Sequence, residues 1–149
     1  MIIYSQRDER WADKQIGQSD LKMGRYGCTV CCVAMLTTYF RDNFTPDELL
    51  KKLQFTSDGL LIWSSCVFPY FKFNLRDYSP SKSVILAHLK DPKLAVILKV
   101  GNINHWVVAY HYNKITGRFL VADPWFGKLV DLKLYDNKIT GAVYFTSLN

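Results

Sequence analysis

Residues 24–40 read GRYGCTVCCVAMLTTYF and combine two glycines, three cysteines and a long apolar run. After Cys28, residues 29–40 form an apolar run without glycine or proline. Such a run is too long for a typical strand and is typical of a buried helix. The preceding Gly24 and Gly27 interrupt regular structure just before the run. We therefore expect Cys28 at the start of a helix, where backbone N–H groups have no partner within the helix.

Further helices are expected along the first part of the chain. Residues 45–48 read TPDE, a helix start in which proline fits the first turn and Glu48 can close a capping box. We predict a third helix over residues 60–71 and a fourth, shorter one over residues 82–89. The opening residues 1–11 are polar and aromatic, and we expect them to be extended and to lie at the surface.

The second part of the chain has the pattern of short strands separated by turns. Turn signals occupy residues 101–104 and 113–117. This pattern predicts a meander of antiparallel strands, and hence an α+β fold with an N-terminal helical half packed on a C-terminal antiparallel β-sheet. No linker or repeat divides the 149 residues, so we expect one domain over residues 1–149. The predicted strands cover residues 94–100, 105–112, 118–122, 128–132 and 142–145.

Composition and charge exclude several classes of protein. The formal net charge is +6, but Lys51 and Lys52 are the only adjacent basic pair, so we expect no nucleic-acid partner. No apolar stretch reaches the roughly 20 residues of a membrane span, so we expect no stable membrane insertion. The first residues do not resemble a secretory signal. We expect a monomer made in the cytoplasm, which something else must release if it acts on the cell wall.

The cysteine pattern favours reduced thiols over a disulfide framework. Three of the four cysteines fall within five residues, and two of them are adjacent. Cys28 and Cys31 have the spacing of half a zinc site, but no second pair follows, so we expect no metal and no cofactor. A redox pair of these two cysteines would be expected to follow a strand in a βαβ unit, and here the preceding segment is irregular.

Cys28 is the cysteine best placed for nucleophilic catalysis. A catalytic cysteine reacts as its thiolate, which a helix N-terminus and a neighbouring imidazole both favour. Of three histidines, His88 lies on a short predicted helix and His111 on a strand without an obvious partner. His105 begins a strand after a polar turn. If its strand pairs with the next one, Asp123 reaches the same sheet edge and can hold the imidazole in one tautomer.

An acyl-transfer site also needs donors for the developing oxyanion. The backbone N–H of Cys28 is one candidate. Gln6 is a candidate amide donor in the polar N-terminal segment, and Gln15 and Gln18 compete with it.

Several short motifs resemble, in order, the family of bacteriocin-processing-peptidase-like cysteine peptidases. The resemblance spans nearly the whole chain and implies a papain-like fold. It also implies a Cys28 nucleophile, a His105 base, an Asp123 that orients the histidine, and Gln6 as the oxyanion amide. The matching segments are residues 4–11, Gly17, residues 23–28 leading into residues 32–36, residues 45–49, Gly59 with residues 62–63, residues 105–108, and residues 123–124 with Gly127.

The same resemblance implies a peptide or peptidoglycan-peptide substrate, because stand-alone domains of this type include phage lysins that cut peptide bonds in peptidoglycan. A basic chain without a signal is compatible with such an endolysin. We expect Trp63 in the core, and Trp106 and Trp125 as substrate-binding walls of a groove. The competing hypothesis is a non-catalytic peptide-binding module of the same fold.

Overall fold

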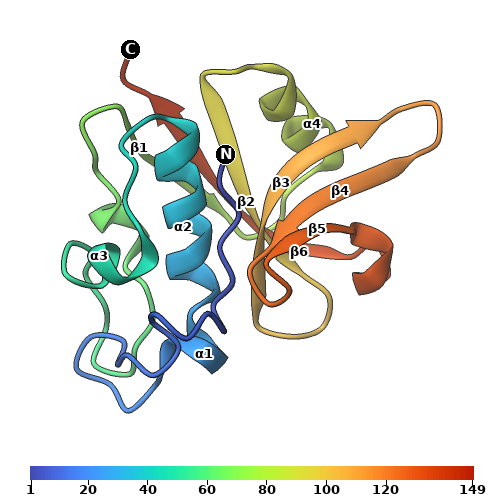
Figure 1. The fold of residues 1–149 in the computed structure, drawn as a ribbon. Coiled ribbons are helices and arrows are strands. Elements are labelled where there is room, and N and C mark those ends of the chain that lie inside the picture. The colour runs from blue at the N-terminus through green and yellow to red at the C-terminus, as the bar shows by residue number, and fades with distance from the viewer.

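The apolar run that follows Gly27 forms the central helix, α2 (Cys28–Tyr39), in a computed structural model that describes residues 1–149 (Figure 1). α2 packs against a six-stranded sheet and begins at the predicted cysteine. It is the longest helix, with 12 residues, and no helix has the length and hydrophobicity that crossing a bilayer requires. The other helices are α1 (Met23–Tyr26), α3 (Pro46–Leu50) and α4 (Lys82–Lys90), with 3₁₀ turns η1 (Trp63–Ser65) and η2 (Leu132–Tyr135).

The sheet is antiparallel throughout and has the order β1-β6-β2-β3-β4-β5. Four strands at one end of the sheet follow the predicted meander, because β2, β3, β4 and β5 are neighbours in chain order. β6, however, lies between β1 and β2, so the last strand returns to the far side of the meander. The strands are β1 (Phe71–Asp77), β2 (Leu94–Val100), β3 (His105–Asn113), β4 (Arg118–Asp123), β5 (Lys128–Asp131) and β6 (Ile139–Ser147).

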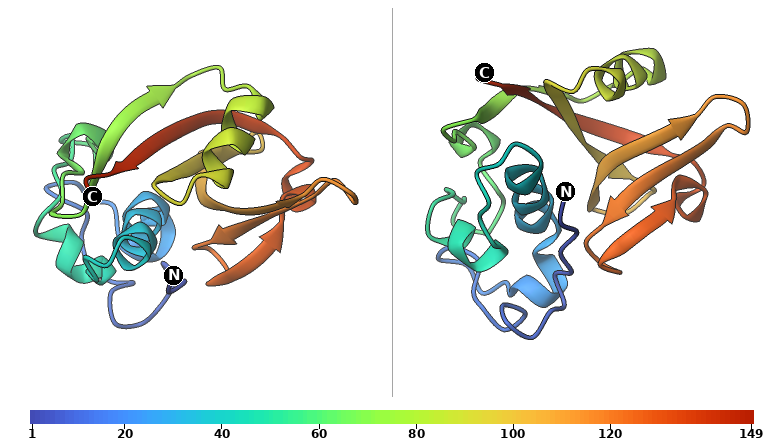
Figure 2. Two further views of the ribbon diagram at one scale, coloured as in Figure 1. Left: turned by 90° about the horizontal axis from the view of Figure 1, so that it is seen from above. Right: turned by 45° about the horizontal axis from the view of Figure 1, so that its top comes forward.

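Helices cover both faces of the sheet. Side chains alternate between the faces of a strand, and on β2 Ile97 belongs to the core that includes α2, whereas Val96 and Leu98 belong to the core that includes Ile85 of α4. Figure 2 shows this arrangement from two further directions, with α2 on one side of the sheet and α4 on the other. The α+β class and the helical half packed on an antiparallel sheet are therefore confirmed.

The predicted helix starts are confirmed. α3 begins at Pro46 with a capping box, in which the Glu48 carboxylate accepts the backbone N–H of Thr45 at 3.3 Å. α4 covers the predicted residues 82–89 and ends one residue later. Its N-cap, Ser81, accepts the backbone N–H of Val84.

The predicted helix over residues 60–71 is wrong. Only η1 is helical there, and the segment then runs irregularly into β1, which was not predicted. Pro69 has no backbone N–H and disfavours helical geometry at Phe68, so a helix cannot pass this point. Phe68 and Phe71 are instead stacked at 4.8 Å between ring centroids. The apolar residues therefore face the core from a bent segment.

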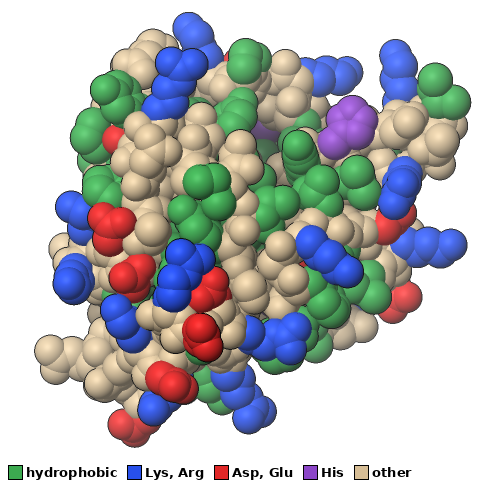
Figure 3. Space-filling model, in the orientation of Figure 1, with side chains coloured by type: hydrophobic (Ala, Val, Ile, Leu, Met, Phe, Trp, Pro, Cys, Tyr) green, Lys and Arg blue, Asp and Glu red, His purple; other side chains and the backbone are tan.

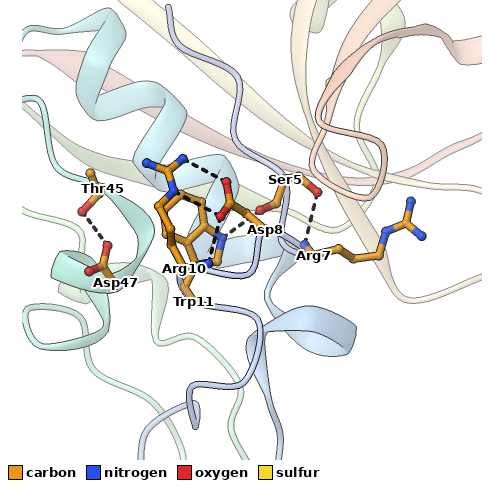
Figure 4. A network of polar contacts seen from close by, with 7 residues as sticks. All are labelled: Ser5, Arg7, Asp8, Arg10, Trp11, Thr45 and Asp47. Atoms are coloured by element: carbon orange, nitrogen blue, oxygen red, sulfur yellow. Dashed lines mark hydrogen bonds and ion pairs between the residues drawn. The ribbon is translucent and has the colours of Figure 1, made fainter.

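The expectation of an extended, surface-lying N-terminal segment is also wrong. Residues 6–13 form successive turns, and Tyr4, Gln6 and Trp11 are buried. Figure 4 shows the polar contacts that hold these turns: the indole N–H of Trp11 donates to the Ser5 carbonyl at 2.8 Å, and Arg10 pairs with Asp8 at 2.9 Å. The burial of aromatic rings beneath the turns fixes the segment against α2.

Candidate active site

Cys28 is the first residue of α2, so its backbone N–H has no acceptor within that helix. Gly27 precedes it as the N-cap, where a Cβ would lie 2.6 Å from both the Met23 carbonyl oxygen and the Met23 sulfur. Only glycine therefore fits this tight entry. The side chain of Cys28 is largely buried, with 7% of the residue exposed. The first backbone N–H groups of a helix have no acceptor within the helix and can donate to a bound group.

His105 and Asp123 meet at one edge of the sheet, as their strands predict. β3 begins at His105 and pairs with β4, which ends at Asp123. The His105 Nε2 lies 2.8 Å from Oδ1 of Asp123. Nδ1 is the remaining nitrogen of the imidazole, and Cys28 and His105 are close enough to interact through their side chains.

The electrostatics of this site favour a protonated imidazole. Burial alone lowers the pKa of His105, but hydrogen bonding to Asp123 and Cys28 and the charges of these two groups outweigh it and raise the pKa to about 9. Asp123 is completely buried, with 0% exposed. A neighbouring anionic sulfur and an imidazolium would therefore stabilise each other.

The Asp123 carboxylate has two further donors. The backbone N–H of Trp125 donates to Oδ1 at 2.9 Å, and the hydroxyl of Tyr135, at the end of η2, donates to Oδ2. The Tyr135 ring also lies 5.6 Å from the ring of His105. Burial first, and then the adjacent carboxylate, raise the pKa of Tyr135. Sequence reasoning missed Tyr135, because no spacing links it to Asp123.

Tyr135 positions Asp123, and its hydroxyl can be tested alone. We expect Tyr135→Phe to slow alkylation of Cys28 by about two- to tenfold and to lower the free energy of unfolding by about 1 kcal/mol, as for one lost hydrogen bond. Iodoacetamide kinetics and urea unfolding would measure these effects. Leu134→Ala is the control, because Leu134 is exposed beside Tyr135. Equal effects of both substitutions would contradict a positioning role.

Gln6 lies at the same site, although it comes from the N-terminal segment. Its backbone N–H donates to the Pro124 carbonyl at 2.8 Å, and its side chain is buried, with 1% of the residue exposed. The amide Nε2 donates to the Gly24 carbonyl at 3.4 Å, and Oε1 has no partner. Gly127 has a positive φ of 68°, and a Cβ there would lie 2.8 Å from Cβ of Ser5. Glycine at this position therefore allows the two segments to approach this closely.

The candidate residues share one cleft of about 430 Å³. Cys28, Gln6 and His105 line it, and Asp123 lies behind His105. The competing glutamines Gln15 and Gln18 are exposed and do not line it. The tryptophans that line the cleft are Trp63, Trp106 and Trp125.

These three tryptophans differ in burial. Trp63 and Trp106 are both buried core residues, and their ring centroids lie 5.0 Å apart. Each ring therefore serves the core and the cleft wall together. Trp125 is 36% exposed, and Arg7 packs over its ring at 4.4 Å and donates to its carbonyl at 3.0 Å. Figure 4 shows Arg7 pointing away from the Asp8 and Arg10 pair.

The other cysteines are buried and distinct from Cys28. Burial raises the pKa of Cys31 and Cys32 well above the ordinary thiol value and that of Cys66 to about 12. The Cys32 thiol donates to the Trp106 carbonyl at 3.3 Å. All four cysteines are free thiols. No strand precedes Cys28, as a thioredoxin-like redox motif would require.

The other two histidines lie outside the cleft. The ring centroids of His88 and Tyr144 lie 4.4 Å apart, and His88 is half-buried on its helix, whereas His111 is exposed on β3. No group of three or more His, Cys, Asp or Glu side chains is arranged to hold a metal ion.

Comparison with known proteins identifies the family of the chain. The model of the peptidase C39 family matches residues 19–137, most of the chain and all of the site except Gln6. A search of curated proteins gave no significant match. The chain therefore belongs to the peptidase C39 family of cysteine peptidases.

Proposed function

We propose that this protein hydrolyses a peptide or amide bond, with Cys28 as nucleophile, His105 as general base and acid, and Asp123 as the residue that orients His105. The observation that carries the proposal is the 2.8 Å contact between His105 Nε2 and Asp123 Oδ1, with Cys28 beside the same imidazole. Because the Nε2 proton is held by Asp123, Nδ1 is left to exchange a proton with the Cys28 thiol.

The reaction follows from these positions. The thiol proton passes to His105, the sulfur attacks the carbonyl carbon, and the carbonyl π electrons move onto oxygen. His105 then gives its proton to the leaving nitrogen as the C–N bond breaks, which leaves a thioester on Cys28. Water, deprotonated by His105, attacks the thioester, and the free acid leaves as the thiol is restored.

The developing oxyanion would be held by two neutral donors. The N–H of Cys28 has no acceptor within α2, and the amide of Gln6 is buried at the same cleft. The weak bond from Gln6 Nε2 to the Gly24 carbonyl leaves a second N–H on that nitrogen for the oxyanion. Gln6 is held in place by its backbone contact with Pro124.

We further propose that the substrate is the peptide of bacterial peptidoglycan and that the protein is a phage-type endolysin acting as a monomer. The formal charge of +6 supports this substrate, because cell walls carry acidic polymers. Such a protein would be made in the cytoplasm and released through a partner pore. Zymography on purified bacterial cell walls tests this substrate, and a peptide library tested in parallel would detect a different one.

Alkylation tests the proposed nucleophile. We expect iodoacetamide to label Cys28 at least tenfold faster than the three buried thiols, and His105→Ala to slow this labelling by about tenfold or more. Peptide mass spectrometry after timed quenching would measure both rates, with His88→Ala as the control outside the cleft. Equal labelling of all four cysteines would refute the mechanism, and peptide binding without turnover would favour the non-catalytic module.

A further inference from the structure

The cleft beside Cys28 carries positive charge without any balancing carboxylate. Three basic residues line it, namely Arg25, Arg76 and Lys99, and no aspartate or glutamate does. Asp123 does not contribute negative charge to the wall, because it is completely buried behind His105. The proposed nucleophile therefore lies in a cleft whose charged lining residues are all basic.

Two of these cations lie near the end of β3 that begins with His105. Lys99 on β2 is the cross-strand partner of Trp106, the residue directly after His105. Arg76 on β1 packs over the Trp106 ring at 5.5 Å and over the Tyr78 ring at 4.5 Å. Both side chains are half-buried. Trp106 therefore neighbours both cations, and all three side chains line the same cleft.

Neither cation is neutralised by the protein. The four ion pairs of the structure involve other groups, and no side chain accepts a hydrogen bond from Arg76 or Lys99. Asp77 is adjacent to Arg76 but is engaged with Tyr144, which belongs to the core on the opposite face of the sheet. The two side chains keep their donors free for a ligand.

On the face of the molecule drawn in Figure 3, no basic patch extends this charge. Figure 3 shows lysine and arginine side chains dispersed over the visible face, interspersed with acidic ones, rather than gathered into one patch. A nucleic-acid surface would need an extended basic stripe. A cleft of about 430 Å³ with aromatic walls instead fits a short segment of peptide.

We propose that Arg76 and Lys99 select peptides that carry a carboxylate within one or two residues of the scissile bond. The proposal rests on the proposed peptidase function, for which it names the class of substrate. A guanidinium binds a carboxylate through two parallel N–H donors, and an ammonium adds a point charge. Because both groups are half-buried, water screens them less than it screens surface charges.

Probes anchored on Cys28 test this selectivity without a known substrate. N-iodoacetyl-glutamic acid amide and N-iodoacetyl-glutamine amide differ only in a carboxylate against a carboxamide. In both, the sulfur displaces iodide and forms a thioether. We expect the glutamic acid probe to label Cys28 about three- to tenfold faster, relative to free cysteine under the same conditions. N-iodoacetyl-alanine would show whether a terminal carboxylate is equally effective.

Variants assign the preference to the two cations. We expect Arg76→Met with Lys99→Met to bring the ratio of the two rates close to one, while Lys99→Arg keeps it. Methionine retains the apolar stem that packs against Trp106 and Tyr78. Lys114→Met removes one positive charge from the exposed β3–β4 turn, outside the cleft, and should leave the ratio unchanged. Thermal melting of each variant verifies folding.

The outcomes separate this proposal from the one on which it rests. Fast labelling of Cys28 that depends on His105, but with equal rates for both probes, would overturn the acidic-substrate proposal alone. A preference that survives in the double variant would also overturn it, because Arg25 or the imidazolium of His105 would then be its source. Slow labelling by both probes without dependence on His105 would overturn the peptidase mechanism first.

Discussion

Cys28→Ala is expected to abolish hydrolysis, with a loss in kcat/KM of about 10⁴-fold or more, because no other group in the cleft can form the thioester. Cys28→Ser should be almost as inactive, since a hydroxyl gives up its proton far less readily than a thiol. Release of soluble fragments from purified bacterial cell walls, together with cleavage of a fluorogenic peptide library, would measure the loss.

Cys66→Ala is the matched control for this experiment. Cys66 is fully buried, does not line the cleft and has a pKa raised to about 12. Its replacement should lower stability through a small cavity but leave the rate per folded molecule unchanged. If Cys28→Ala kept measurable hydrolysis while folded, Cys28 would not be the nucleophile.

Asp123→Ala is expected to produce the second-largest effect, a loss in kcat/KM of about a hundredfold or more. The substitution frees the His105 imidazole to rotate and leaves the partly buried donors of Trp125 and Tyr135 without their acceptor. Asp123→Asn should recover a large part of the activity, because an amide oxygen can still accept the proton on Nε2. The same hydrolysis assays would measure both, and equal activity of the two variants would contradict an orienting role.

The same pair of variants separates orientation from charge through pH. The pKa of His105 is raised to about 9 in the fold, from about 6.5, so the protonated imidazole stabilises the folded state. This stabilisation is fully present below pH about 6.5 and is lost as the pH rises through about 9. The melting temperature of the protein should fall across this window.

Both Asp123→Ala and Asp123→Asn should weaken this pH dependence, because each removes the negative charge that retains the proton on His105. Activity would then differ between the two variants while the pH dependence of melting would not. An unchanged pH profile in Asp123→Asn would show that the charge of Asp123 does not hold the proton.

Residues close together in the sequence predicted the helices and strands whose start or pairing they determine. The glycines before Cys28 and the uninterrupted apolar run after it predicted a helix that begins at Cys28, and α2 does so. Turn residues between β-rich runs predicted that the strands of His105 and Asp123 pair, and the register places the two side chains in contact. These residues were predictable because their neighbours in sequence determine their structure.

Elements that depend on distant partners were not predictable in this way. The segment around Phe68 has enough apolar residues for a helix, and its actual path follows from Pro69 and from stacking with Phe71. β6 finds its place between β1 and β2 through long-range pairing. Tyr135 reaches Asp123 only because η2 follows β5 at the sheet edge. No pattern of neighbouring residues encodes these contacts.

The insertion of β6 between β1 and β2 has a consequence during biosynthesis. Until residues 139–147 have left the ribosome, the sheet exists as two unconnected parts, with β1 apart from β2 and the rest of the meander. Cys28 is translated long before β3 and β4. The sheet that carries the imidazole of His105 is still incomplete until β6 has been translated. The thiol of a nascent chain would therefore be inactive. Peptidase activity would be gained only when β6, the strand that joins the two parts, has been translated.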